Sequence, residues 1–171
     1  MSRIQGVVTG QVTSVDDPDK QGRVQVSLPY LGGHNQSYWA PVATLVAGNG
    51  RGAWFMPKVG DEVLIAFNQG DVAHPHVLGC LWNGQDAPPT TDQTLGVFRS
   101  RIGMEFRFCD PVDGDPAEAY IRLQFSRGDG AVNIVEINNT SIVLRSDAAI
   151  SIEAPAVTIN GRPVVPGAGP I

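Results

Sequence analysis

The chain has 171 residues, 42% of them hydrophobic and 17% charged, with a formal net charge of −5. This hydrophobic content excludes a disordered chain. Only two of the 12 basic residues are Lys, and no half of the chain is basic, which argues against phosphate-driven nucleic-acid binding. The 20 Gly, the 13 Pro and the lack of sustained helical periodicity predict an all-β protein.

Five short strands are predicted in the first half. Val- and Thr-rich residues 6–15 form the first strand, which ends in the Asp- and Pro-rich turn 16–19. Residues 23–28 then alternate between apolar and polar side chains, as a half-buried strand does, with Val24, Val26 and Leu28 on the apolar face. Three further strands are predicted at residues 37–45, 62–67 and 75–82. Five strands in fewer than ninety residues favour a small Greek-key barrel of the OB type.

The second half has a different pattern, and the Pro-rich stretch 86–92 marks the boundary. Residues 101–108 alternate, which predicts Ile102, Met104, Phe106 and Phe108 inward and Arg101, Gly103, Glu105 and Arg107 outward. Shorter β-branched runs follow at residues 121–125, 132–134, 140–144, 149–152 and 156–161. Each run is too short to close a core, so the segment predicts a β-prism or β-helix that needs other chains.

Residues 52–67, Gly70-Asp71 and residues 75–84 carry a resemblance to a known family. The runs P-x-x-G-D-E-V, G-D and P-x-x-x-G-x-x-x-N follow one another as in the OB domain of the phage baseplate central spike and of its type VI secretion relative, VgrG. Residues 101–110, with the pattern R-x-G-x-x-x-x-F-x-D, resemble the start of the triple-stranded β-helix in these spikes. The resemblance implies an N-terminal OB-fold barrel followed by a C-terminal intertwined trimeric β-helix.

The expected organisation is an OB collar at residues 1–89, a linker at 90–98, a β-helical needle at 99–162 and a blunt tip at 163–171. Three chains around one axis bury Val and Ile in the middle and leave no sheet edge free. The trimer core is predicted to contain Ile142, Leu144, Ile150, Ile152, Val157 and Ile159.

His74 and His76 are the candidate metal ligands, because two imidazoles two residues apart share a face of an extended segment. The favoured interpretation is that they bind no metal, and no catalytic motif or cofactor site is predicted. The Pro- and Gly-rich end cannot continue a strand ladder. By resemblance, such a blunt end seats a conical PAAR-type tip protein, here on Pro163, Val164, Val165 and Ile171.

The sequence therefore predicts a non-enzymatic, homotrimeric central spike of a contractile injection machine. The machine is a phage tail, a tailocin, a type VI apparatus or an extracellular injection particle. Expected partners are the tube and hub proteins of the baseplate, the tip protein and, transiently, the target membrane. Without an apparent signal peptide, the chain is expected to be made in the cytoplasm and delivered to the target envelope within the particle. A single-stranded nucleic-acid binder and a carbohydrate-active β-helix protein are the alternatives.

Overall fold

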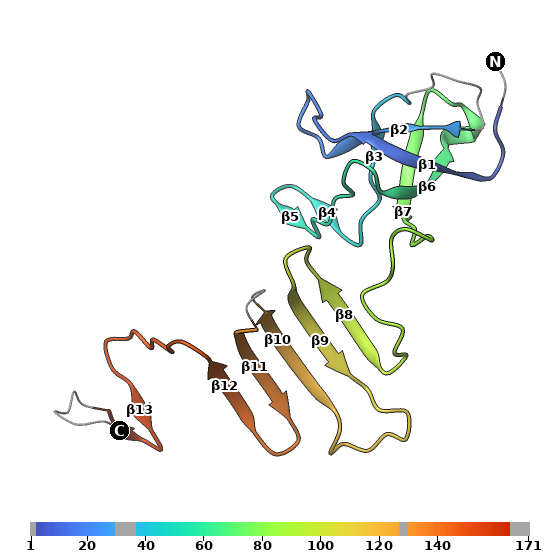
Figure 1. The fold of residues 1–171 in the computed structure, drawn as a ribbon. Helices are drawn as coiled ribbons and strands as arrows, with labels where there is room; N and C mark the ends of the chain where they lie inside the picture. The colour runs from blue at the N-terminus through green and yellow to red at the C-terminus, as the bar shows by residue number, and fades with distance from the viewer. Residues whose placement is uncertain (1–2, 30–36, 127–129, 165–171) are drawn as a thin grey trace. The chain divides into compact units, whose positions relative to one another are not determined.

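A computed structural model describes residues 3–29, 37–126 and 130–164 of the chain. The fold is all-β, as predicted, and it divides into two compact units, residues 1–88 and 89–171 (Figure 1). Among the described residues, none belongs to a helix long and apolar enough to cross a membrane.

The first unit is a nearly closed five-stranded barrel. Its strands pair in the order β3-β2-β1-β6-β7, and all of these pairs are antiparallel. A parallel bridge between Val42 and Val77 brings the chain after β3 against β7. Irregular register in two strand pairs, at Val12/Ser14 and at Leu64/Ile65, adds the curvature that such closure needs. The strands of the barrel are β1 (Val7–Ser14), β2 (Arg23–Ser27), β3 (Ala40–Pro41), β6 (Glu62–Phe67) and β7 (Pro75–Cys80).

Alternation along these strands fills the barrel. In β6, Val63, Ile65 and Phe67 are buried and the residues between them are half-buried. Val24 and Val26 of β2 are fully buried as well, which confirms the face predicted for this strand. The core consists of Val12, Val24, Val26, Leu28, Ala40, Val63, Ile65, Phe67 and Val77.

The turn between β1 and β2 is organised by the Asp17 carboxylate. This group accepts hydrogen bonds from the backbone N–H groups of Asp19, Gln21 and Arg23, at 3.1, 2.7 and 3.2 Å. The Arg23 guanidinium donates to the same carboxylate, with Nη2 lying 2.6 Å from Oδ1. The Arg23 guanidinium, and then the backbone donors, hold the pKa of Asp17 well below its usual range.

One predicted strand is much shorter than expected. Of residues 37–45 only Ala40 and Pro41 form a strand, because the chain then leaves the barrel for a small hairpin. This hairpin pairs β4 (Ala47–Gly48) with β5 (Arg51–Gly52). A short 3-10 turn, η2 (Asn68–Gly70), precedes β7.

The second unit is built on a five-stranded antiparallel sheet in which each strand pairs with the next one along the chain (Figure 1). A single chain therefore forms a meander and not the predicted β-helix, because intertwining requires further chains. The strands are β8 (Leu95–Arg99), β9 (Met104–Cys109), β10 (Tyr120–Ser126), β11 (Val132–Asn138) and β12 (Ile142–Ser146).

Three details of the second unit differ from the sequence prediction. Residues 95–98 of the predicted linker belong to β8. Residues 101–103 form the turn before β9 and do not belong to the strand, since the N–H of Gly103 donates to the Ser100 carbonyl. Residues 149–152 form no strand. Beyond them, the turn Asn160-Gly161, with φ of 50° and 74°, joins β13 (Thr158–Ile159) to β14 (Arg162–Pro163).

Candidate functional site

The sheet of the second unit has one apolar face, which is uncovered in the single chain. Cross-strand register places Phe98, Phe106, Leu123, Val135 and Leu144 opposite one another in a row that crosses all five strands. A second row contains Phe108, Ile121, Ile137 and Ile142. These nine side chains are 39–74% exposed, and none is charged. We call this surface the open face.

The opposite face of the sheet carries charged side chains that pair with one another. Glu105 is only 7% exposed and accepts hydrogen bonds from Arg99 and Arg107, with Nη2 of Arg107 lying 2.6 Å from Oε2. On the neighbouring strands, Nε of Arg122 lies 2.7 Å from Oε2 of Glu136. The amide of Asn138 and the Arg122 guanidinium lower the pKa of Glu136. The carboxylates of Glu105 and Glu136 are thus paired with arginines of the same chain, although the buried Nε of Arg107 has no hydrogen-bond partner among the described residues.

In the single chain, the charged face of β9 is more buried than its apolar face. Met104, Phe106 and Phe108 share one face and Glu105 and Arg107 the other, which confirms the predicted alternation. In the single chain, however, Glu105 is buried by its arginines and Phe106 remains 39% exposed. The reason is that long charged side chains cover their own face, whereas no described element covers most of the apolar one.

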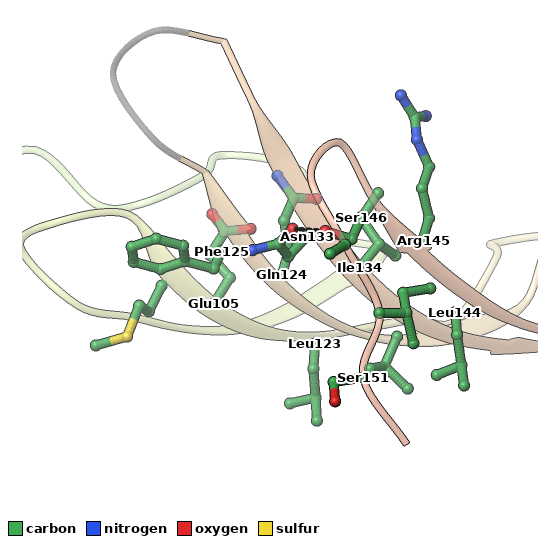
Figure 2. A pocket seen from close by; sticks show the side chains of 14 residues that line it. Glu105, Leu123, Gln124, Phe125, Asn133, Ile134, Leu144, Arg145, Ser146 and Ser151 are labelled. Carbon is green, nitrogen blue, oxygen red and sulfur yellow. Dashed lines mark hydrogen bonds between the residues drawn. The ribbon is translucent and has the colours of Figure 1, made fainter. Parts of the chain in front are cut away.

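Part of the open face forms a groove of about 560 Å³ beside the segment 149–151, which returns to the sheet after β12. In Figure 2, Leu123 and Leu144 point to the side of the sheet on which Ser151 lies, whereas Arg145 points away. Apolar side chains from β10, β11 and β12 line the groove together with Ile150. The segment thus lies against the sheet through side chains, without strand pairing.

The residues predicted for the trimer core occupy different environments. Ile142 and Leu144 lie on the open face, and Ile150 lines the groove with Leu144. Ile152 is exposed outside any strand. Val157 is half-buried and Ile159 exposed at the β13–β14 hairpin. The prediction that these six residues form a trimer core is not tested by a single chain.

The sequence prediction omitted the aromatic residues from this list. Phe98 and Phe106 stack with ring centroids 6.3 Å apart, and Phe106 and Phe108 are 6.4 Å apart. Phe98 lay in the predicted linker, residues 90–98. The signal that could have revealed the cluster is the apolar stretch 95–98 immediately after the Pro-rich boundary.

The candidate metal ligands do not share a strand. His74 lies in the turn before β7, where its N–H donates to the Asp71 carbonyl and its Nδ1 lies 3.2 Å from Oδ2 of Asp71. His76 lies within β7 and is exposed. The backbone N–H of Ala73 and the His74 imidazole lower the pKa of Asp71. Within the described residues, no three His, Cys, Asp or Glu side chains are grouped so that they could hold a metal ion.

The predicted tip is described only in part. Pro163 pairs with Thr158, and the N–H of Val164 donates to the Val157 carbonyl at 2.7 Å. The Val164 side chain is exposed. Val165 and Ile171 lie outside the described residues.

Comparison with known proteins identifies the first unit. Residues 8–82 match the model of the type VI secretion system/phage-baseplate injector OB domain. VgrG4b, a type VI secretion system spike protein of Pseudomonas aeruginosa, is 38% identical over 101 residues, which cover 55% of this chain and 12% of that protein. The actin cross-linking toxin VgrG1 of Vibrio cholerae is 34% identical over 77 residues, 43% of this chain and 7% of the toxin.

A second spike protein of Pseudomonas aeruginosa, VgrG1a, is 27% identical over 139 residues, or 78% of this chain. This match is longer than the first unit and so extends into the second. It covers 21% of VgrG1a, so the chain spans about a fifth or less of the length of these relatives. Residues 8–82 thus match the injector OB domain of type VI secretion systems and phage baseplates, and the chain is VgrG-like.

Proposed function

We propose that the chain is the structural central spike of a contractile injection machine, and that it acts as a homotrimer. The observation that carries this proposal is the match of residues 8–82 to the injector OB domain, joined to a second unit that leaves an apolar sheet face open. In this proposal, residues 1–89 form a collar, 90–98 connect it to the needle, 99–162 form the needle and 163–171 the blunt tip.

The needle is proposed to be an intertwined β-helix of three chains. Support comes from the five-stranded meander, whose open face has too much exposed apolar surface for a soluble monomer. Residues 149–152 have no strand partner within the chain, and in this proposal neighbouring chains pair with them. The proposed trimer core retains Ile142, Leu144, Ile150, Ile152, Val157 and Ile159.

Partners follow from this role. The collar joins the tube and hub proteins of the baseplate, and a PAAR-type protein sits on Pro163, Val164, Val165 and Ile171. The tip then contacts the target membrane when the sheath contracts. We propose that the chain itself is not an enzyme and uses no cofactor: VgrG4b and VgrG1a are named as spike proteins, and the match to the Vibrio toxin covers 7% of that protein.

The test is genetic. In cells that carry the gene, we expect its deletion to abolish intact contractile particles and injection of the target cell, and a plasmid copy to restore both. An epitope-tagged chain should be found in the purified particles at three copies per spike. Intact and active particles in the deletion strain would exclude the proposed function.

A further inference from the structure

One continuous part of the first unit differs in charge from the rest of the chain. Residues 20–60 contain no Asp or Glu, although the chain as a whole has 17 acidic residues and a net charge of −5. The basic residues of this part are Lys20, Arg23, Arg51 and Lys58. Arg23 is neutralised by Asp17, with Nη2 lying 2.6 Å from Oδ1. The remaining cations lie in a stretch of sequence that supplies them with no carboxylate.

A groove of about 440 Å³ lies within this part of the first unit. It is bounded by the β1–β2 turn at Gly22, by the hairpin of β4 and β5, and by the segment that follows the hairpin, which carries Trp54 and Phe55. Of the described residues that line it, Arg51 alone is charged. The volume falls within the range of about 300–1,000 Å³ that is usual for ligand pockets. We call this site the hairpin groove.

The hairpin groove stays open because most of the hairpin has little or no side chain to fill it. Its small lining residues are Ala47, Gly48, Gly50, Gly52 and Ala53. The hairpin backbone is nevertheless fixed. The N–H of Ala53 donates to the Val46 carbonyl at 3.0 Å, and the Thr44 hydroxyl donates to the Ala53 carbonyl at 2.7 Å. The groove is therefore present before any ligand binds.

The indole of Trp54 is exposed and yet held in place. The side chain is 73% exposed, and its ring lies over Gly22, where a Cβ would come within 2.9 Å of the ring. Any side chain at this position would displace the indole. Trp and Arg are among the residues that contribute most to protein interfaces. An anchor that is positioned before binding loses less conformational entropy when its ligand arrives.

The lining of the hairpin groove selects one class of ligand. An indole, small apolar walls and one guanidinium fit an apolar group that lies beside a carboxylate. A single-stranded nucleic acid requires a row of Lys and Arg along its phosphates, and the groove offers Arg51 alone among its described lining residues. A membrane requires apolar side chains that enter the bilayer interface, whereas the turn that ends the hairpin is Asn49-Gly50. A protein segment meets both requirements of the groove.

We propose that the hairpin groove binds a peptide segment of another protein, in which an aromatic or branched apolar side chain lies beside an Asp or Glu. The apolar side chain packs against Trp54, and the carboxylate pairs with Arg51. This assignment goes beyond the proposed spike, because it gives the first unit a ligand of its own and does not depend on how copies of the chain associate.

The probe is a displayed library of random peptides, selected on the full chain; the enriched peptides are then synthesised with a fluorescent label. They should combine an aromatic or branched apolar residue with Asp or Glu. Trp54→Ala should weaken their binding at least about tenfold, as the loss of an anchor does. Leu45→Ala is the control and should leave the Kd unchanged. Leu45 is 88% exposed and lies between two lining residues, but it does not line the groove itself.

A second variant closes the groove without removing the anchor. Ala47 is exposed on β4 and lines the groove, so the larger side chain of Ala47→Leu occupies the space of the ligand. It should also weaken binding at least about tenfold. Emission from Trp39 and Trp82, which both lie in the first unit, reports whether Trp54→Ala is folded.

The charge of the groove has its own pair of variants. Arg51→Gln should weaken peptide binding and make the remaining affinity less sensitive to salt, because the ion pair with the peptide carboxylate is lost. Lys20→Gln removes a cation from the same acid-free part of the sequence, but Lys20 does not line the groove. It should change neither the affinity nor its salt dependence. Equal effects of the two variants would refute a specific role for Arg51.

Several results would overturn the proposal. A library that yields no binder would do so, as would peptides that bind Trp54→Ala and Ala47→Leu as tightly as the wild type. Binding of phosphatidylglycerol vesicles or of a single-stranded oligonucleotide that Trp54→Ala abolishes would put that ligand in place of a peptide. A lower mass of Trp54→Ala in light scattering would identify a second copy of the chain as the occupant. The deletion test of the proposed spike is independent of all these results.

Discussion

Replacement of Gly10 by Ala tests the packing of the barrel at its tightest point. Gly10 lies in β1, opposite Val63 of β6, and its backbone has no positive φ. A Cβ at this position would lie 2.6 Å from the carbonyl oxygen of Ser27 and 2.7 Å from Cδ1 of Ile65. Ordinary contact begins at 3.4 Å, so the methyl group overlaps a backbone atom that the β1–β2 pairing holds in place.

Gly79→Ala is the matched control. Gly79 lies in β7 opposite Leu64, also without positive φ, and a Cβ there has no neighbour within 4 Å. In a strand, Ala is more favourable than Gly by roughly 0.5–1 kcal/mol, and this gain is common to both variants. Overpacking costs about 1–3 kcal/mol, and only Gly10→Ala incurs it. The two variants should therefore differ in the free energy of unfolding by about 1–3 kcal/mol.

Thermal unfolding followed by tryptophan emission measures this difference in the first unit alone, because all three Trp residues lie there. For a unit of this size, each kcal/mol lowers the Tm by about 4–8 °C. We expect Gly79→Ala to melt at or slightly above the wild-type temperature and Gly10→Ala at least about 4 °C below Gly79→Ala. Equal melting temperatures would show that β1 and β2 do not approach each other as described.

Three further predictions concern the turn, the histidines and the tip. The pKa of Asp17 is lowered in the folded state, so the ionised carboxylate stabilises the fold above the unfolded pKa of about 4, and this stabilisation is lost as the pH falls below that value. Asp17→Asn should therefore lower the Tm at pH 7 and make the Tm less dependent on pH in acid. Asp16→Asn should have neither effect. Chelator treatment should leave the Tm unchanged if His74 and His76 hold no metal, and a chelator-sensitive melt would refute this. Deletion of residues 165–171 should preserve the trimer mass but abolish co-purification of a PAAR-type protein, and retention of that protein would disprove docking at the tip.

The local sequence pattern was sufficient to predict most of the strands. The alternation of residues 23–28 predicted β2 with its buried face, because a barrel interior selects every second side chain. Residues 62–67 were predicted as a strand, but they are apolar on both faces, so only the structure showed that Val63, Ile65 and Phe67 fill the barrel. The motifs of residues 52–84 identified the OB domain that the family comparison then confirmed. The hairpin of β4 and β5 was missed because its short Gly-rich strands carry no periodicity.

By itself, the sequence determined that this protein is all-β, that its first half is a VgrG-like OB barrel, and that residues 104–108 separate apolar from charged side chains. Only the tertiary structure decided which strands meet. It joined Phe98 of the supposed linker to Phe106 and Phe108 in one cluster, and it showed that Glu105 is buried by arginines while the apolar face stays open. The physical reason is that alternation specifies two faces of a strand, whereas cross-strand register and the presence of a covering surface determine which of them is buried.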